Sequence, residues 1–199
     1  MRACFAFLVD NEIHNFSRKL AFDSDIKNNT GFISARLPQH ITLGPTFDVK
    51  NLEEVEKYFD YLAESIKPLE VLVKDIDLKI FGDEENGFPV LWMNIQESEE
   101  LRELHNKIYK YISEHSWDTD NNEKYYFHST IALGEQPASV YKEIFKSIPV
   151  KEINHNFLVK EIALFCTTDS ESRMGTYITY KILNLGFINE ECWEIQKKI

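Results

Sequence analysis

The sequence predicts an α+β fold of two pseudo-symmetric lobes, in which mainly antiparallel sheets and flanking helices surround a central cleft. Three observations predict this class. Strand-like and helical segments run along the chain in two similar halves, each half holds one His-x-Thr segment, and no low-complexity tract or flexible linker separates the halves. The 199 residues are 43% hydrophobic, which is enough to bury a core. We therefore expect a single bilobal domain over residues 1–199.

The first predicted units are a strand, a helix, a loop and a second strand. Residues 2–9 form a short apolar run, and Asp10 follows as a candidate helix N-cap. The helix predicted over residues 11–22 carries three apolar residues on one face: Ile13, Phe16 and Leu20. Residues 21–35 are rich in Asn and Asp and predict a loop, and strand character returns within residues 32–44.

Helices and strands then alternate to the end of the chain. Apolar residues at helical spacing predict helices over residues 51–67, 98–115 and 138–148. Alternating or continuous apolar runs predict strands over residues 69–81, 89–96, 127–133, 156–167 and 175–185. The last two strands are joined by a polar loop, which predicts an antiparallel pair.

The charge and cysteine content restrict the partners that the protein can have. The net charge of −11 repels duplex DNA at long range, although a local pocket can still hold a small anion or the end of a strand. Three widely spaced cysteines indicate neither a disulfide framework nor a zinc ribbon and fit a reducing compartment. We expect neither a membrane span nor a signal peptide, because no apolar stretch approaches the ~18 residues of a span and the first residues lack a basic region followed by a long apolar one. We expect a soluble, cytoplasmic monomer that does not bind membranes.

The two His-x-Thr segments carry the chemistry. Residues i and i+2 of a strand share a face, so His40 and Thr42 project together, as do His128 and Thr130; Ser129 points the other way. Two such strands side by side would place two imidazoles and two hydroxyls in one groove, which suits an oxyanion. One imidazole can act as base and the other as acid, since each has an unperturbed pKa of ~6.5. The hydroxyls can donate to the non-bridging oxygens of a phosphate.

Two other interpretations of the histidines compete with this one. A single His-x-Thr segment in a strand is common and means little, and both segments could be ordinary core in a structural protein. Two histidines with hydroxyls are also a weak set of zinc ligands, and no HExxH pattern is present. The recurrence of the segment in both halves favours the phosphate site. We expect neither a metal nor another cofactor.

The segments PQHITLG (residues 38–44) and FHSTIALG (residues 127–134) resemble the two motifs of the 2H phosphoesterase superfamily, which contains 2′-5′ RNA ligase-like proteins and cyclic nucleotide phosphodiesterases. The resemblance extends over nearly the whole chain. It implies metal-independent hydrolysis or formation of a 2′,3′-cyclic phosphate or a 2′-5′ phosphodiester bond. By this resemblance the catalytic residues are His40, Thr42, His128 and Thr130. Which histidine is the base depends on how the substrate is oriented.

Further ligand contacts are predicted from residue type alone. Seven aromatic residues could stack on an unpaired base: Phe5, Phe7, Trp92, Tyr125, Tyr126, Phe127 and Tyr177. Arg173 could close over a phosphate with a forked contact. The competing interpretation is that the aromatics are core residues and that the arginine is solvated.

The leading hypothesis is a phosphodiesterase that acts on a small nucleotide, an oligonucleotide or an RNA end. Three substrates fit: a 2′,3′-cyclic phosphate at an RNA end, a 2′-5′-linked oligoadenylate, and a cyclic dinucleotide or cyclic oligonucleotide. The alternatives are 2′-5′ RNA ligase activity and a non-catalytic protein that binds RNA or nucleotides. The acidic composition favours the smaller ligands.

Overall fold

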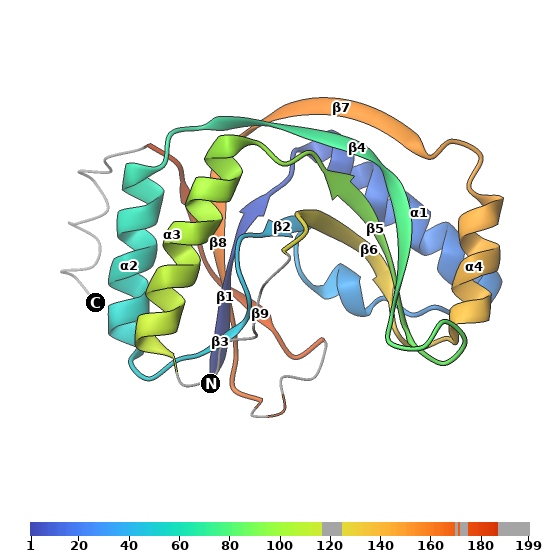
Figure 1. Ribbon diagram of the computed structural model, residues 1–199, viewed down its shortest axis with the longest axis horizontal. Helices are drawn as coiled ribbons and strands as arrows, with labels where there is room; N and C mark the ends of the chain where they lie inside the picture. The colour runs from blue at the N-terminus through green and yellow to red at the C-terminus, as the bar shows by residue number, and fades with distance from the viewer. Residues whose placement is uncertain (117–124, 170, 172–174, 187–199) are drawn as a thin grey trace.

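The computed structural model describes residues 1–116, 125–169, 171 and 175–186. Two antiparallel sheets form its frame (Figure 1). The first has the order β2-β1-β8-β9, and β3 also pairs with β1; these strands are β1 (Arg2–Leu8), β2 (His40–Thr42), β3 (Phe47–Asp48), β8 (Glu161–Thr167) and β9 (Ile178–Asn184). The second has the order β6-β5-β4-β7, made of β4 (Leu69–Phe81), β5 (Phe88–Ile95), β6 (His128–Leu133) and β7 (Glu152–Val159).

The helices reveal how the two halves are joined. They are α1 (Asn11–Asn28), α2 (Leu52–Ser65), α3 (Glu99–His115), α4 (Ala138–Ser147) and a short 3₁₀ helix, η1 (Ile33–Arg36). Figure 1 shows α2 and α3 side by side over the first sheet, while α1 and α4 lie with the second. In each half, the helix that follows the first strand or hairpin lies with the sheet of the other half. This helix is α1, which follows β1, in the first half, and α3, which follows the hairpin of β4 and β5, in the second. The predicted α+β fold with two similar lobes is confirmed.

Side chains cap the starts of α1 and α3, and the cap of α1 is the predicted residue, Asp10. Asp10 is the N-cap of α1, and its Oδ1 accepts a hydrogen bond from the backbone N–H of Ile13 at 2.9 Å. Ser98 caps α3 in the same way, accepting from Leu101 N at 3.2 Å. Such caps satisfy backbone donors that have no partner within the helix.

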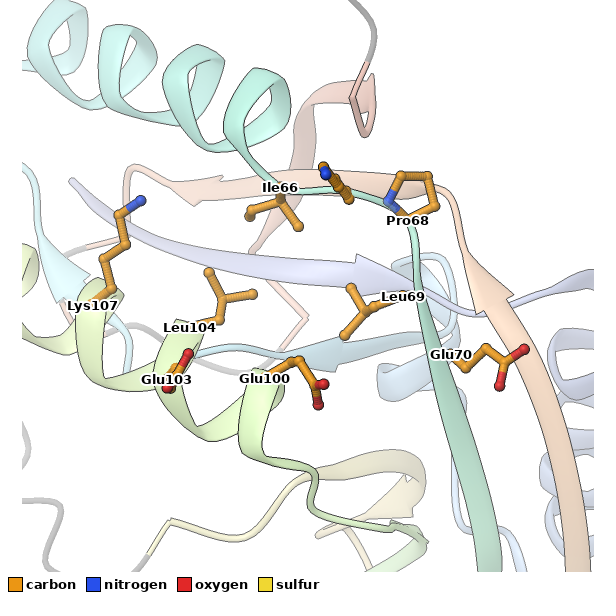
Figure 2. Close-up of a pocket in the computed structure, with 9 residues that line it drawn as sticks. Ile66, Pro68, Leu69, Glu70, Glu100, Glu103, Leu104 and Lys107 are labelled. Carbon is orange, nitrogen blue, oxygen red and sulfur yellow. The ribbon is translucent and has the colours of Figure 1, made fainter.

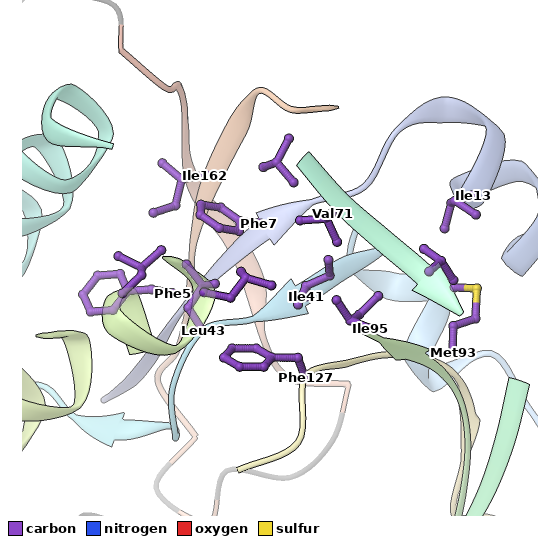
Figure 3. Close-up of a cluster of buried hydrophobic side chains, with 14 of the residues drawn as sticks. Phe5, Phe7, Ile13, Ile41, Leu43, Val71, Met93, Ile95, Phe127 and Ile162 are labelled. Carbon is purple, nitrogen blue, oxygen red and sulfur yellow. The ribbon is translucent and has the colours of Figure 1, made fainter. Parts of the chain in front are cut away.

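One hydrophobic cluster extends through both lobes. It includes Phe5 and Phe7 of β1, Met93 and Ile95 of β5, and Phe127, which precedes β6 (Figure 3). Each of these side chains is at most 6% exposed. Because the cluster draws on both sheets, separating the lobes would expose apolar surface on each.

Helix α1 differs from its prediction in length and in its buried face. Residues 21–28, predicted as loop, continue the helix, which ends where Asn29 adopts the left-handed conformation at φ 53°. The buried face is made of Ile13, Ser17, Ala21 and Ser24, whereas Phe16 is 40% exposed. The pattern of large apolar residues was misleading because small residues on a helix allow its backbone to approach a sheet closely.

Two predicted strands were also wrong in extent. Within residues 32–44 only His40–Thr42 form a strand, and Ile33–Arg36 form η1. The single strand predicted over residues 156–167 is two strands, β7 and β8, which belong to different sheets. The chain crosses between the sheets at Lys160, so a continuous apolar run conceals a change of partner. The predicted antiparallel pairing of the last two strands, β8 and β9, is confirmed.

No helix within the described ranges is long and apolar enough to cross a membrane.

Candidate active site

The two His-x-Thr segments occupy equivalent strands, because β2 and β6 are each the edge strand of their sheet. His40 and Thr42 are half-buried around the fully buried Ile41. In β6 the half-buried His128 and Thr130 flank Ser129, which is 0% exposed (Figure 1 locates both strands). Strand alternation therefore places the histidine and threonine of each segment on one face, as predicted.

The free edge of β2 points toward the second lobe. Ile41 is paired with Phe7 of β1, and the N–H of Leu43 donates to β1 as well. In an antiparallel pair the alternate residues direct their backbone groups to the opposite edge. The carbonyl groups of His40 and Thr42 therefore face away from β1.

Side chains of the second half supply hydrogen bonds to both of these carbonyls. Ser129 Oγ donates to His40 O at 2.7 Å, and Tyr125 Oη donates to Thr42 O at 2.6 Å. The two motif strands are thus joined by side-chain-to-backbone bonds, although they belong to different sheets. Buried carbonyls left without donors would cost stability, which makes these bonds important for holding the strands together.

The first half makes matching bonds to the second motif. Gln39 is 3% exposed, and its Nε2 donates to Ser129 Oγ and to Thr130 O, each at 2.7 Å. Ser34 Oγ donates to Ile131 O at 2.6 Å. Bonds therefore run in both directions between the segments that carry the two histidines.

Both imidazoles are held by the same local geometry. His40 Nδ1 lies 2.8 Å from Pro38 O, and His128 Nδ1 lies 2.8 Å from Tyr126 O, in each case the carbonyl two residues earlier. A carbonyl only accepts, so this network assigns the proton to Nδ1 in both neutral rings. In each ring Nε2 then carries the free lone pair, and no described residue hydrogen-bonds with this nitrogen.

An aromatic ring supports each imidazole. The ring centroids of His40 and Phe165 lie 4.8 Å apart at 67°, an edge-to-face contact. Those of His128 and Trp92 lie 4.2 Å apart at 31°. Phe165 and Trp92 are at most 2% exposed, so each histidine rests on a rigid buried surface.

Burial keeps both histidines neutral near neutral pH. Desolvation lowers the pKa of His40 to about 4, against the opposing effect of its hydrogen bond to Pro38 O; the charges of His128 and Arg18 lower it further. Desolvation likewise lowers the pKa of His128, opposed by its bond to Tyr126 O. The effect of the His128 charge on His40 indicates that the two rings are electrostatically coupled.

Acid should destabilise the protein because the folded chain holds His40 neutral. Its pKa of about 4 lies below the ordinary value of 6.5, so between these values the unfolded chain binds a proton that the folded chain does not. We expect the free energy of unfolding to fall as the pH drops through this range, by up to about 1.4 kcal/mol per pH unit from this group. Urea unfolding of the wild type and of His40→Asn measures the difference. Parallel pH profiles for the two proteins would contradict the prediction.

A small cavity lies at the meeting point of the motifs. Its volume is about 160 Å³, and its lining includes His40 from the first motif, Thr130 from the second, and Arg36 and Tyr177. Arg36 is the one cation among the described lining residues, and its Nη1 donates to Gly175 O at 2.9 Å. The cavity is smaller than typical ligand pockets and suits part of a nucleotide.

A larger cavity of about 630 Å³ lies elsewhere, between α3 and the start of β4 (Figure 2). It is lined by Leu69, Leu104 and charged residues of both signs, including Glu100, Glu103 and Lys107. It contains no residue of either His-x-Thr segment. We therefore assign the candidate site to the smaller cavity, on chemistry rather than volume.

The predicted ligand contacts have different outcomes. Phe5, Phe7 and Phe127 were wrong as ligand contacts, because each is at most 3% exposed within the core (Figure 3). Trp92 is 2% exposed and lies against His128, so it supports the imidazole. Tyr126 is 48% exposed and supplies the carbonyl that orients His128. Tyr177 lines the cavity. Arg173 lies outside the described residues.

Sequence reasoning missed Arg36, Gln39 and the hydrogen bond of Tyr125, which was predicted as a ligand contact instead. Arg36 lies in a segment that was predicted as strand, and only the 3₁₀ turn brings it to the cavity. Gln39 is adjacent to the first motif and Tyr125 is three residues before His128. This proximity was the one available signal, because their partners lie in the other half of the chain.

Comparison with known proteins shows similarity in both sequence and fold. The family described as the 2′-5′ RNA ligase superfamily matches residues 12–171, whereas no curated protein matches the chain. Among solved structures, TT0787 of Thermus thermophilus is 16% identical with a TM-score of 0.67, covering 94% of this chain and 100% of that one. E. coli LigT complexed with 3′-AMP is 19% identical with a TM-score of 0.58, covering 94% and 98%. The complex of LigT with NADP+ gives 18% and 0.55, with the same coverage.

The family match spans both His-x-Thr segments and most of the two sheets. At identities below 20%, the structural similarity shows a shared fold. The family match covers well over half of the chain. The chain therefore belongs to the 2′-5′ RNA ligase superfamily, the 2H phosphoesterases.

Proposed function

We propose that the protein is a metal-independent phosphodiesterase that hydrolyses a 2′,3′-cyclic phosphate or a 2′-5′ phosphodiester bond in a small nucleotide, an oligonucleotide or an RNA end. One observation carries the proposal. Two imidazoles from separate halves have the same Nδ1-to-carbonyl bond, and each leaves its Nε2 free. A pair of this kind can take a proton from one oxygen of a phosphodiester and supply a proton to another.

The environments of the rings suggest a role for each. Burial lowers the pKa of His40 to about 4, so this ring stays neutral and can act as the base. In hydrolysis of a cyclic phosphate, a water molecule gives its proton to His40 Nε2 and its oxygen forms a bond to phosphorus. The bond from phosphorus to the 2′ oxygen breaks, and that oxygen takes a proton from His128. The negative charge of the bound phosphate would raise the pKa of His128 and so favour the protonated acid.

The threonines and Arg36 complete the proposed phosphate site. No described residue hydrogen-bonds with the hydroxyl of Thr42 or Thr130, so both are free to donate to non-bridging oxygens. Arg36 adds positive charge at the same cavity, within a chain whose net charge is −11. Local donors of this kind can bind a small anion although the net negative charge of the protein repels anions at long range.

The size of the cavity favours small substrates or strand ends. A volume of about 160 Å³ holds a sugar phosphate or one base, and a longer ligand would extend outside. LigT, which shares the fold, has been crystallised with 3′-AMP and with NADP+. We therefore place 2′,3′-cyclic nucleotides first among the substrates, ahead of 2′-5′-linked oligoadenylates and cyclic dinucleotides.

A substrate screen with EDTA present tests the function. The wild-type protein is incubated with 2′,3′-cyclic nucleotides, 2′-5′-linked oligoadenylates and cyclic dinucleotides, and products are separated by chromatography. We expect turnover of at least one class without added metal. An absolute metal requirement would contradict the mechanism. Joining of RNA ends would indicate the ligase, and binding without turnover would indicate a non-catalytic protein.

Loss of Arg36 should weaken substrate binding more than the chemical step. Arg36→Ala removes a charge-assisted contact with phosphate, and we expect KM to rise about 10-fold with kcat within about 3-fold. Steady-state kinetics on the best substrate of the screen measure both constants. Lys57→Ala is the matched control, because it removes an exposed cation of α2. Equal effects of the two substitutions would show that Arg36 has no specific role.

A further inference from the structure

The strands that carry the two motifs are joined by a buried polar bridge. Ser129 Oγ donates to the carbonyl of His40 and accepts from Nε2 of Gln39, with both distances at 2.7 Å. A serine hydroxyl has one hydrogen to donate, and here it goes to the backbone of the opposite motif. Ser129 and Gln39 are 0% and 3% exposed, so solvent has little access to replace either bond.

We propose that Ser129 is a positioning residue whose hydroxyl, held by Gln39, fixes the separation of the His40 and His128 imidazoles. This inference rests on the proposed function, since it concerns the geometry that acid-base catalysis by the pair would require. Ser129 lies on the face opposite the cavity and is not itself a catalytic residue.

The positions of the bonded residues in the chain support this role. Ser129 follows His128 directly, and the carbonyl that it contacts belongs to His40 itself. Gln39 directly precedes His40, and its amide also donates to the carbonyl of Thr130. The bridge therefore acts within one residue of each histidine, and a change in its length would be transmitted to both rings.

A second hydrogen bond between the two motif segments, from Tyr125, lies farther from His128. Tyr125 Oη donates to Thr42 O at 2.6 Å, but Tyr125 is three residues before His128 and lies in the segment that leads into β6. It can hold the far end of β2 in place without setting the position of the His128 ring. Ser129 is thus the shortest connection between the two histidines.

The rate of acid-base catalysis depends steeply on the positions of the reacting groups. Moving a reacting group by about 1 Å can cost about 10²-fold in rate. Without the Ser129 hydroxyl, the carbonyl of His40 at the free edge of β2 loses its donor. The strands would then separate or admit a water molecule, and either response moves the imidazoles relative to each other.

Kinetics of Ser129→Ala test the proposal. We expect kcat to fall about 10- to 100-fold, with KM for a 2′,3′-cyclic nucleotide within about 3-fold of the wild type. Ser24→Ala is the matched control, because Ser24 is also buried, at 4% exposure, and donates through Oγ to a backbone carbonyl at 2.8 Å within α1. This control should keep the kcat of the wild type.

A second variant, Gln39→Met, tests the proposal if Ser129→Ala does not fold. Gln39→Met keeps nearly the same volume and removes the amide that holds the Ser129 hydroxyl and Thr130 O. We expect a smaller fall in kcat, about 3- to 10-fold, with KM again nearly unchanged. A kcat within 2-fold of the wild type in the folded variants, or a rise in KM alone, would overturn the proposal.

A measurement without substrate separates this inference from the proposed function. Ring signals of His40 are titrated by NMR with and without His128→Gln, first with Ser129 present and then with Ser129→Ala. In the presence of Ser129, removing the His128 charge should raise the pKa of His40; with Ser129→Ala this shift should shrink. If the wild type turns over no substrate, the proposed function fails, and this comparison still decides the positioning role. An unchanged shift would overturn it.

Discussion

Replacing either His40 or His128 with alanine should lower kcat by about 10²–10⁴-fold, the usual contribution of a positioned acid or base. Each ring offers one free Nε2, and its Nδ1 proton is held by a backbone carbonyl, so neither ring can perform both proton transfers at once. The double substitution should cost little more than either single one, because residues that act as a unit are not additive. Initial rates on the best substrate of the screen, with EDTA present, measure all three variants.

His115→Ala is the control for these substitutions. Its Nδ1 also lies 2.8 Å from a backbone carbonyl, that of Tyr111, but it is exposed at the end of α3. We expect the activity of the wild type in this variant. Full activity in His40→Ala or in His128→Ala would show that the pair does not catalyse the reaction, provided that circular dichroism shows both variants to be folded.

The sequence was sufficient to predict which residues of each motif share a face. That prediction depends only on the period of two in a strand, and it holds for His40, Thr42, His128 and Thr130. The fold class was equally accessible, because the order of strand-like and helical segments was repeated in the two halves. Local periodicity therefore carried most of the correct predictions.

Contacts between the halves could not be predicted in this way. The bonds of Gln39 and Ser129 join residues far apart in the sequence, and their geometry depends on both motif strands being edge strands. The division of residues 156–167 into β7 and β8 has the same origin, since only the two sheets decide where the chain changes partner.

The aromatic residues show a further limit of a single sequence. Strand alternation predicts that Phe7 and Trp92 each point to one face of a strand. It does not predict which elements cover that face. In the structure Phe7 enters the core shared by both sheets, and Trp92 lies beneath His128. Both are nearly unexposed, so residue type alone overestimated their contact with ligand.

Replacing Thr42 or Thr130 with valine should lower kcat by about 10²–10³-fold, the usual effect of removing one donor to a developing oxyanion. Valine keeps the branched shape and suits a strand, so the change removes the hydroxyl with little effect on packing. Both side chains are half-buried beside their histidines, and no described residue uses either hydroxyl, so its loss breaks no bond within the described chain. KM should change less than kcat, because negative charge on the non-bridging oxygens increases toward the transition state.

Serine at the same positions separates the hydroxyl from the shape of the side chain. Thr42→Ser and Thr130→Ser keep the donor and should retain activity within about 10-fold of the wild type, since a donor in place contributes most of the oxyanion stabilisation. Thr46→Val is the matched control, because Thr46 is also half-buried and lies four residues after Thr42, outside the motif. Valine and serine variants with equal kcat would show that the hydroxyls do not contact the phosphate. A loss in Thr46→Val as large as that in Thr42→Val would trace the effect to the fold of this segment instead.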